Sequence, residues 1–300
     1  MFLDNLDTLD HLDYLSAMPP TDHERISIIG LGAIGGSLAL AWRGAASIRG
    51  WSRDAADRDQ ARAAGIAVYA GDESAWPTDM ADSTAVVVAV PVNELARVVR
   101  QLQSILPDEC LLLHVASLQS REALGLSDPE FQRVLGTHPL AGSERSGFAA
   151  ATMEMFHGAT LRAEARATPA ERERIERLWR AAGIARIVWQ DATRHDALMS
   201  WVSHLPQLNA IAIAAVLADR DIHPRDLGPG ARDATRLAAS DLGMWASILE
   251  RAPAETATAV RRLTSVLEEL ADALEAHDAH SLERAWQAAR AWRMRGEGPA

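Results

Sequence analysis

The chain has 300 residues, of which 48% are hydrophobic and 24% charged, a composition typical of a globular protein with one large domain or two ordinary ones. Its formal net charge is −11 and every basic side chain is arginine, so it lacks the basic cluster that nucleic acid or an anionic membrane would require. The single cysteine, Cys110, excludes an internal disulfide framework and a cysteine-rich metal site, and we expect no metal.

Residues 1–24 precede the first predicted strand as an N-terminal extension. This segment carries acidic side chains where a secretory signal carries basic ones. No stretch of the chain is expected to supply the ~20 apolar residues of a membrane helix, so we expect a cytoplasmic protein without membrane contact. Leucines at every third position from Leu3 to Leu15 indicate a short amphipathic helix for packing or dimer contacts.

Residues 25–191 alternate short β-rich runs with stretches of helical spacing. Strands are predicted at 26–29, 46–51, 84–90, 110–115, 160–166 and 185–189. Helices are predicted at 34–45, 55–64 and 95–105, and another begins after the N-cap Thr168, with Pro169 in its first position. This alternation predicts an α/β fold with a Rossmann-type doubly wound, mostly parallel sheet, the dinucleotide-binding domain.

The pattern changes after Asp191. Residues 192–218, 233–250 and 253–293 are rich in alanine and leucine at helical spacing, and almost nothing there resembles a strand. We therefore expect a C-terminal all-helical domain over residues 192–295 that serves substrate binding and dimerisation. Its apolar helices have little else to bury them, which favours a homodimer.

A glycine-rich turn, Gly30-Leu-Gly32-Ala-Ile-Gly35, follows the first predicted strand and opens the first helix. The first glycine permits the tight turn, the second lets the backbone approach a pyrophosphate, and the third lets helix and strand pack closely. A helix N-terminus there offers free N–H groups to the phosphate. The pattern predicts a bound dinucleotide rather than an empty glycine turn. The residues expected to bind it are Gly30, Leu31, Gly32, Ala33, Ile34, Gly35, Ser52, Arg53, Val90 and Pro91.

The end of the second predicted strand bears on the choice between NADP and NAD. A site for NAD usually carries an acidic residue there, whereas this chain has Ser52 and Arg53, which suit a 2′-phosphate. Asp54 and Asp57 stand nearby and are alternative positions for the acidic residue. NADP is favoured, and NAD stays open.

A histidine followed by proline, His138-Pro139, opens a stretch rich in glycine and serine. We interpret this stretch as a loop rather than a regular element, which would put the histidine outside the core. Oxidation of a secondary alcohol needs a group that takes the hydroxyl proton, and a neutral imidazole suits this task near pH 7. The alternative is a histidine that stabilises its loop by a hydrogen bond.

Three segments resemble one known family in their order and spacing. His138-Pro-Leu-Ala-Gly-Ser-Glu-Arg-Ser-Gly147 resembles the HPMAGxExSG signature of the prephenate dehydrogenase family. His195-Asp196 with Ser203-His204-Leu-Pro206 is similar to that family's HD…SHLPH segment. Residues 230–245 are similar to its GFRDxTRIAxSDPxMW segment. The resemblance runs from about residue 26 to residue 245.

This resemblance implies a dehydrogenase that oxidises and decarboxylates a small cyclohexadienyl substrate. His138 would accept the proton of the ring hydroxyl, and Ser117 would touch both this histidine and the nicotinamide. Arg236 would bind a substrate carboxylate. The substrate-binding residues that it implies are Arg236, His204, Gln207, Trp245 and Ser143. Two of them have structural alternatives, because Trp245 can be plain core and His204 can hold two helices together.

Departures from the family pattern bear on the substrate. Gln207 replaces the last histidine of SHLPH, Leu118-Gln119 replaces a common Val-Lys, and His114 replaces an aspartate. Two positions that can be cationic are thus neutral amides, which suits a substrate with an ammonium group, since like charges repel. Prephenate stays narrowly ahead of arogenate and 4-amino-4-deoxyprephenate.

Two other interpretations stay open. One is a different dehydrogenase with a helical dimer domain, such as a β-hydroxyacid dehydrogenase or a pyrroline-carboxylate reductase, although these are not expected to place His138-Pro before Ala-Gly-Ser-Glu. The other is a non-catalytic NADP-binding sensor.

Overall fold

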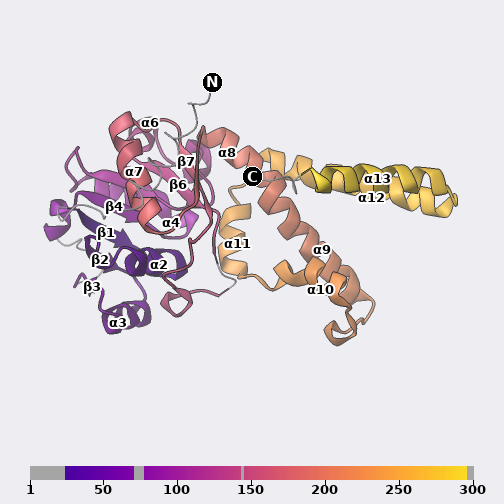
Figure 1. Cartoon of the computed structure of the whole chain (residues 1–300), viewed down its shortest axis with the longest axis horizontal. Helices are drawn as coiled ribbons and strands as arrows, with labels where there is room; N and C mark the ends of the chain where they lie inside the picture. The colour runs from indigo at the N-terminus through magenta and orange to yellow at the C-terminus, as the bar shows by residue number, and fades with distance from the viewer. Residues whose placement is uncertain (1–23, 71–77, 143–144, 296–300) are drawn as a thin grey trace, which may run out of the picture.

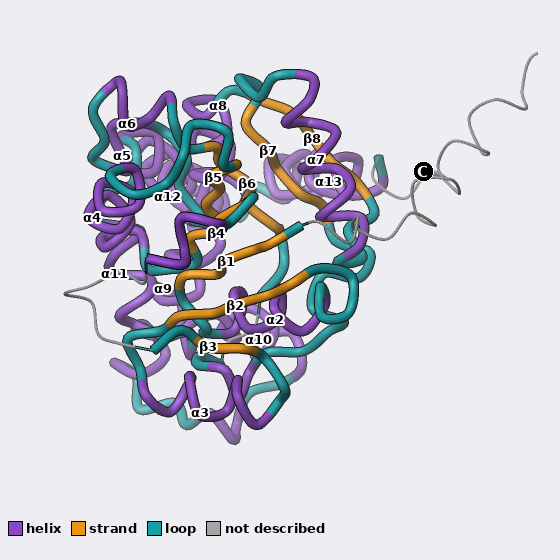
Figure 2. Tube along the Cα trace, turned by 90° about the vertical axis from the view of Figure 1, so that its left-hand side faces the viewer, coloured by secondary structure: helices purple, strands orange, loops and turns teal. Residues whose placement is uncertain are grey.

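A computed structural model describes residues 24–70, 78–142 and 145–295 (Figure 1). Within them the chain forms an eight-stranded sheet in the order β3-β2-β1-β4-β5-β6-β7-β8, whose strands are labelled in Figure 2. The strands are β1 Arg25–Ile29, β2 Ser47–Trp51, β3 Ala67–Val68, β4 Ala85–Val88, β5 Leu111–His114, β6 Leu135–Pro139, β7 Thr160–Glu164 and β8 Arg186–Gln190. Neighbours are parallel except β6 and β7. The doubly wound, mostly parallel sheet predicted from the sequence is confirmed.

Helices cover both faces of this sheet and bury its apolar side chains. On one face pack α2 Ala33–Ala41 and α7 Pro169–Ala181, and on the other α4 Val92–Gln103. The predicted start of α7 is confirmed, because Thr168 and Glu171 form a reciprocal capping box. The remaining helices of this half are α3 Ala55–Ala63, η1 Thr78–Asp82, α5 Arg121–Leu124, α6 Asp128–Gln132 and η2 Phe148–Ala150.

The described residues after β8 contain helices and no strand. One continuous run comprises α8 Ala192–Met199, a π-helical stretch η3 Ser200–His204 and α9 Leu205–Asp219. In Figure 1, the hairpin of α12 and α13 projects away from the sheet, while α9 and α10 form a second arm. The other elements are η4 Pro224–Asp226, α10 Pro229–Thr235, η5 Arg236–Ala239, α11 Leu242–Leu249, α12 Ala254–Glu275 and α13 Ala279–Met294.

Three predicted helices have wrong bounds. Helix α2 ends at Ala41, not at residue 45, because the chain turns at Gly44, whose φ is +88°. The predicted helix at 253–293 is two helices, separated by a turn in which His277 has a φ of 53°. The stretch 233–250 is also divided, since η5 ends at Ala239 before α11 begins.

We expected no stretch that is apolar and long enough to span a membrane, and this expectation is wrong. One helical run passes the test of length and hydropathy. The run Ala192–Asp219 has 28 residues and a window of mean hydropathy 1.4, of which 17% is buried in the single chain. Its first turns carry buried polar residues, His195 and Asp196, which face the sheet. Length and hydropathy alone are therefore weak evidence for a membrane span here.

The predicted amphipathic helix at Leu3–Leu15 and the predicted site residue Ser143 lie outside the described residues.

Candidate active site

The glycine turn lies where β1 passes into α2, and β1 is flanked by β2 on one side and β4 on the other. Gly30 has a φ of +99°, and a Cβ there would overlap Ala89 O. A Cβ on Gly35 would overlap Gly30 O, so the helix approaches the strand as only glycine permits. At Gly32, by contrast, a Cβ would meet nothing within 4 Å, and no side chain caps α2 at this N-cap. The turn is therefore open to a ligand at the helix N-terminus, with close contacts elsewhere.

The other residues expected around the cofactor surround this turn in different ways. Leu31 is fully buried and packs against Gly50, so only its backbone is available to a ligand. Ala33 and Ile34 begin α2. Val90 and Pro91 follow β4, the strand beside β1, and Pro91 precedes α4. They lie at the same sheet edge as the glycine turn, because β1 and β4 are parallel.

The end of β2 carries an interlocked set of polar side chains. Ser52 is buried, and its hydroxyl donates to Asp57 Oδ2 (3.2 Å). Asp57 Oδ1 accepts a hydrogen bond from the Phe148 N–H (2.8 Å), while Asp54 caps α3 by accepting from Ala56 N–H (2.8 Å). Both nearby acidic residues thus have partners within the protein. Arg53 is exposed.

His138 does not lie in a loop, as the sequence suggested, but on β6. It is the fourth residue of this five-residue strand, and Pro139 ends the strand. The expectation of a loop failed because strand β7 pairs with this segment, placing Arg162 opposite His138. The histidine is nevertheless at the carboxyl end of a strand that is parallel to β5, so it shares a sheet edge with the bend that holds Ser117.

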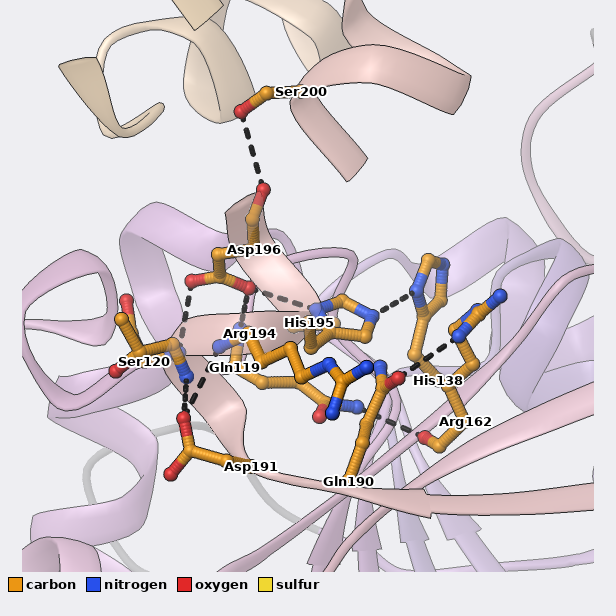
Figure 3. Close-up of polar contacts among 12 residues, drawn as sticks. Gln119, Ser120, His138, Arg162, Gln190, Asp191, Arg194, His195, Asp196 and Ser200 are labelled. Atoms are coloured by element: carbon orange, nitrogen blue, oxygen red, sulfur yellow. Dashed lines mark hydrogen bonds and ion pairs between the residues drawn. The ribbon is translucent and has the colours of Figure 1, made fainter. Parts of the chain in front are cut away.

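A hydrogen-bonded series of three side chains starts at His138 (Figure 3). His138 Nδ1 lies 3.0 Å from His195 Nε2, and His195 Nδ1 lies 2.8 Å from Asp196 Oδ1. Asp196 also accepts the backbone N–H groups of Gln119 (2.8 Å) and Ser120 (2.9 Å). His195 and Asp196 are the fourth and fifth residues of α8, so the helical half of the chain supplies two of the three members.

The carboxylate sets the tautomers of both rings. Burial opposes ionisation of Asp196, yet hydrogen bonds from His195, Ser120 and Gln119 hold the pKa of Asp196 below its usual value. An ionised carboxylate only accepts, so His195 Nδ1 carries a proton; when both rings are neutral, His195 Nε2 then accepts a hydrogen bond from His138 Nδ1. The assignment leaves His138 Nε2 as a lone-pair acceptor.

His138 is neutral in this setting. Although part of the residue reaches the surface, burial of the ring, followed by the neighbouring His195, lowers the pKa of His138 to about 3. A neutral imidazole with a free Nε2 can accept a proton from a hydroxyl group at ordinary pH.

The layer next to this series is buried. Gln119 is fully buried, and its Nε2 donates to Arg162 O (3.0 Å). His114 accepts the Ala116 N–H at Nδ1 (3.3 Å), and burial lowers the pKa of His114 to about 3. A lysine at position 119 would bury an ammonium here, so the neutral amide agrees with the packing.

The substrate-binding residues predicted in the helical half form a second group. His204 Nδ1 lies 3.0 Å from Thr256 Oγ1, and its ring meets Trp245 edge-on, with centroids 6.1 Å apart. Trp245 is partly buried and packs against the apolar cluster between the sheet and α4. His204 therefore does join two helices, η3 and α12, as its structural alternative predicted, and Trp245 is partly core.

Gln207 connects α9 to the segment that begins with Arg236. Its Nε2 donates to Leu237 O (2.8 Å), and its Oε1 accepts from Ser240 Oγ at 3.5 Å. Arg236, the first residue of η5, is exposed. The structure thus bonds Gln207 to the segment that carries Arg236. His138 and its partners form a separate group.

Comparisons with known proteins agree with this arrangement. The family model "Prephenate dehydrogenase, nucleotide-binding domain" matches residues 37–186, and "Prephenate dehydrogenase, dimerization domain" matches residues 191–288. The cyclohexadienyl dehydrogenase of Zymomonas mobilis is 30% identical over 247 residues, which cover 78% of this chain and 83% of that protein. The prephenate dehydrogenase of Lactococcus lactis is 28% identical over 271 residues, covering 87% of this chain and 74% of that protein.

The chain belongs to the prephenate dehydrogenase family.

A solved member of the prephenate dehydrogenase family has the same fold. The Aquifex aeolicus enzyme, crystallised with hydroxyphenyl propionate and NAD+, gives a TM-score of 0.79 at 23% identity, covering 91% of this chain and 98% of that one. The helical half corresponds to the family's dimerisation domain, which explains why apolar side chains such as Val216, Trp286 and Trp292 are exposed in a single chain.

Sequence reasoning missed three residues of this candidate site. His195 and Asp196 matched the family's HD pair but received no function. Their spacing offered a signal, since an adjacent histidine and aspartate at a helix start, after Asp191 as N-cap, can point at the preceding sheet. Arg162, opposite His138, carried no such signal.

Proposed function

We propose that the protein oxidises and decarboxylates prephenate to 4-hydroxyphenylpyruvate with hydride transfer to NAD(P)+, a reaction of tyrosine biosynthesis. The observation that carries this proposal is the series His138–His195–Asp196, which leaves His138 Nε2 as a proton acceptor. It lies at the sheet edge that also holds the glycine turn, because β1, β4, β5 and β6 are mutually parallel.

The residues at this edge fit a dinucleotide. Gly32 leaves room where a pyrophosphate would approach, and the open N-terminus of α2 offers its N–H groups. Val90 and Pro91 continue the same edge toward Ser117. When bound, the nicotinamide supplies the hydride acceptor.

The chain's own contribution to the chemistry is proton transfer and positioning. His138 Nε2 takes the proton of the ring hydroxyl, and the positive charge that forms on the ring is stabilised through His195 by Asp196. Ser117 is proposed to hydrogen-bond the same hydroxyl. Because loss of CO2 makes the ring aromatic, the residues need mainly to hold the reactants and to accept the proton.

Substrate recognition is assigned to the second group. Arg236 presents a guanidinium that can bind a carboxylate by two parallel hydrogen bonds, and Gln207 holds the segment that carries it. His204, Trp245 and Ser143 are proposed to line the rest of the pocket. Arogenate and 4-amino-4-deoxyprephenate are the alternative substrates, favoured by the neutral amide at position 207; the amide at position 119 is a weaker argument because that side chain is fully buried.

NADP is the proposed cofactor, with NAD as the alternative. Asp54 caps a helix and Asp57 holds the Phe148 N–H, so neither is left solely for a ribose hydroxyl. The exposed Arg53 can pair with a 2′-phosphate, and Ser52 can donate to it if its hydroxyl turns away from Asp57. The carboxylate of Asp57, which is bonded to Ser52, opposes a phosphate there and is the argument for NAD.

The proposal also covers organisation. Residues 25–191 are assigned to the nucleotide-binding domain and residues 192–295 to the helical domain, and two copies pair through the latter as a homodimer. The exposed apolar side chains of this half support such pairing. A cytoplasmic location agrees with the lone buried cysteine.

One assay tests the function. Absorbance at 340 nm is followed with prephenate, arogenate and 4-amino-4-deoxyprephenate, each with NAD+ and NADP+. We expect the highest kcat/KM with prephenate and NADP+. Tight cofactor binding without reduction by any of the three substrates would instead identify a non-catalytic sensor.

A further inference from the structure

His138 has a cationic neighbour outside the three sequence segments. Arg162 is directly opposite His138 in the antiparallel pair of β6 and β7. Residues opposite each other in such a pair project from the same face of the sheet, with Cβ atoms about 5 Å apart. In Figure 3 the guanidinium of Arg162 lies beside the ring of His138.

The charge of Arg162 has no anionic partner within the described part of the chain. Its Nη1 donates to the neutral side chain of Gln190, at Oε1 (2.9 Å), and its Nε is buried without a hydrogen bond. Burial and then the nearby Arg186 lower the pKa of Arg162, as expected for a cation that lacks a counter-ion. Among the described residues, this positive charge therefore stands uncompensated next to the proton acceptor.

The other charged and titratable groups around His138 leave this charge in place. From α8 come His195 and Asp196, but the carboxylate is separated from His138 by the His195 ring and is held by two backbone N–H groups. From β5 comes His114, which is buried and neutral. Of the described groups around His138, Arg162 of β7 is thus the one whose charge has no counter-ion.

We propose that Arg162 is a specificity-determining residue that makes the site accept a neutral hydroxyl, and reject an ammonium, on the carbon that is oxidised. This inference rests on the proposed function and refines its substrate. An amine at that carbon must enter either as a cation beside a cation or after losing its proton, and both lower kcat/KM. Arogenate carries its amine on the side chain, away from this carbon, and is not subject to the effect.

Two variants remove the charge by independent routes. Arg162→Gln deletes it, and Gln190→Glu neutralises it by placing a carboxylate at the atom that already accepts from Arg162. Each is expected to raise the ratio of kcat/KM for 4-amino-4-deoxyprephenate to that for prephenate by about tenfold. Repulsion between two unit charges a few ångströms apart in a protein site is large enough for such a change. The ratio of arogenate to prephenate is expected to stay constant.

Matched controls keep or remove charge elsewhere. Arg162→Lys retains the cation and is expected to keep both ratios, as is Arg186→Gln, which removes an exposed arginine from the neighbouring strand. If Arg162→Gln does not fold, Gln190→Glu carries the test. Unchanged ratios in an enzyme that turns over prephenate would overturn the inference alone, whereas no turnover of prephenate by the unaltered protein would overturn the proposed function.

Discussion

The two groups of site residues are held in opposite ways. His138 stands in a strand, bonded to a buried histidine and, through it, to a carboxylate fixed by two backbone N–H groups. Arg236 stands on a short 3₁₀ turn, exposed, in a segment tied to the helix by the side chain of Gln207. Under the proposed function, this difference becomes a division of work: a rigid proton acceptor preorganised in the sheet, and a carboxylate-binding arm that can adjust to its ligand.

One continuous helical run connects the two groups. It starts with His195 and Asp196 in α8 and reaches Gln207 in α9, and its π-helical stretch between them is the kind of irregularity that often accompanies functional sites. In that stretch Ser200 and His204 turn inward and share the hydroxyl of Thr256. The run thus fixes the rigid group at one end while carrying the adaptable one further along.

The largest effect is expected at the proton acceptor. His138→Asn is expected to lower kcat by roughly 10²–10⁴-fold, the usual worth of general base catalysis, with little change in KM. Steady-state kinetics with prephenate measure it, and His157→Asn, at an exposed histidine on the surface, serves as the control. Full turnover by His138→Asn would remove the base from the mechanism.

The second largest effect is expected at Arg236, and it should appear in KM rather than in kcat. Arg236→Gln is expected to raise KM for prephenate by roughly 10- to 100-fold, because hydrogen bonds to a charged group are each worth about 1.5–3 kcal/mol. Arg236→Lys keeps the charge but not the fork and is expected to fall between. Arg232→Gln, one turn earlier and also exposed, is the matched control. If kcat fell instead of KM rising, the proposed division of work would be wrong.

Substitution of His195 tests whether it orients the His138 ring, because this role would change kcat and leave substrate binding nearly unchanged. His195→Phe fills a similar volume but can neither accept from His138 nor donate to Asp196, so the tautomer of His138 is no longer set. We expect kcat to fall roughly 30-fold, about 2 kcal/mol, at nearly constant KM. His195→Gln, which can both accept and donate, is expected to recover part of the loss. A change in thermal stability without a change in kcat would mark His195 as merely structural.

The sequence predicted the secondary structure of the molecule better than the environment of His138, the proposed base. The glycine turn, the start of α7 and most of the strands follow from local chemistry: a positive φ, a capping box, β-branched runs. His138 was found through its motif, but its strand was missed, since β6 gains β7 as an antiparallel partner in a sheet predicted to be mostly parallel.

Long-range pairing explains the residues that sequence reasoning passed over. Arg162 becomes a neighbour of His138 only through that β6–β7 register, and Gln119 becomes buried only when it packs over Gly136 and bonds β7. A property that depends on which strands lie side by side has no local signature in the chain. From the sequence, the neutral Gln119 suggested a positively charged substrate. In the structure, the burial of this side chain is sufficient to explain why it is neutral.

The last prediction concerns His114, which lies beside the group that contains His138. Its substitution is expected to change stability in acid and to leave turnover unchanged. The pKa of His114 is lowered to about 3 by burial, from a value near 6.5 for an unhindered histidine. The unfolded chain therefore binds a proton that the folded chain refuses as the pH falls below 6.5, and stability is lost over that interval.

His114→Asn keeps an acceptor for the Ala116 N–H but cannot be protonated. Between pH 7 and pH 5 the free energy of unfolding should fall by about 2 kcal/mol less in this variant than in the unaltered protein, while kcat at pH 7 stays the same. Urea titrations at the two pH values measure the difference. Equal losses in both proteins would mean that the layer beneath His138 admits a proton, and the rigidity assigned to that group would then have to come from the sheet alone.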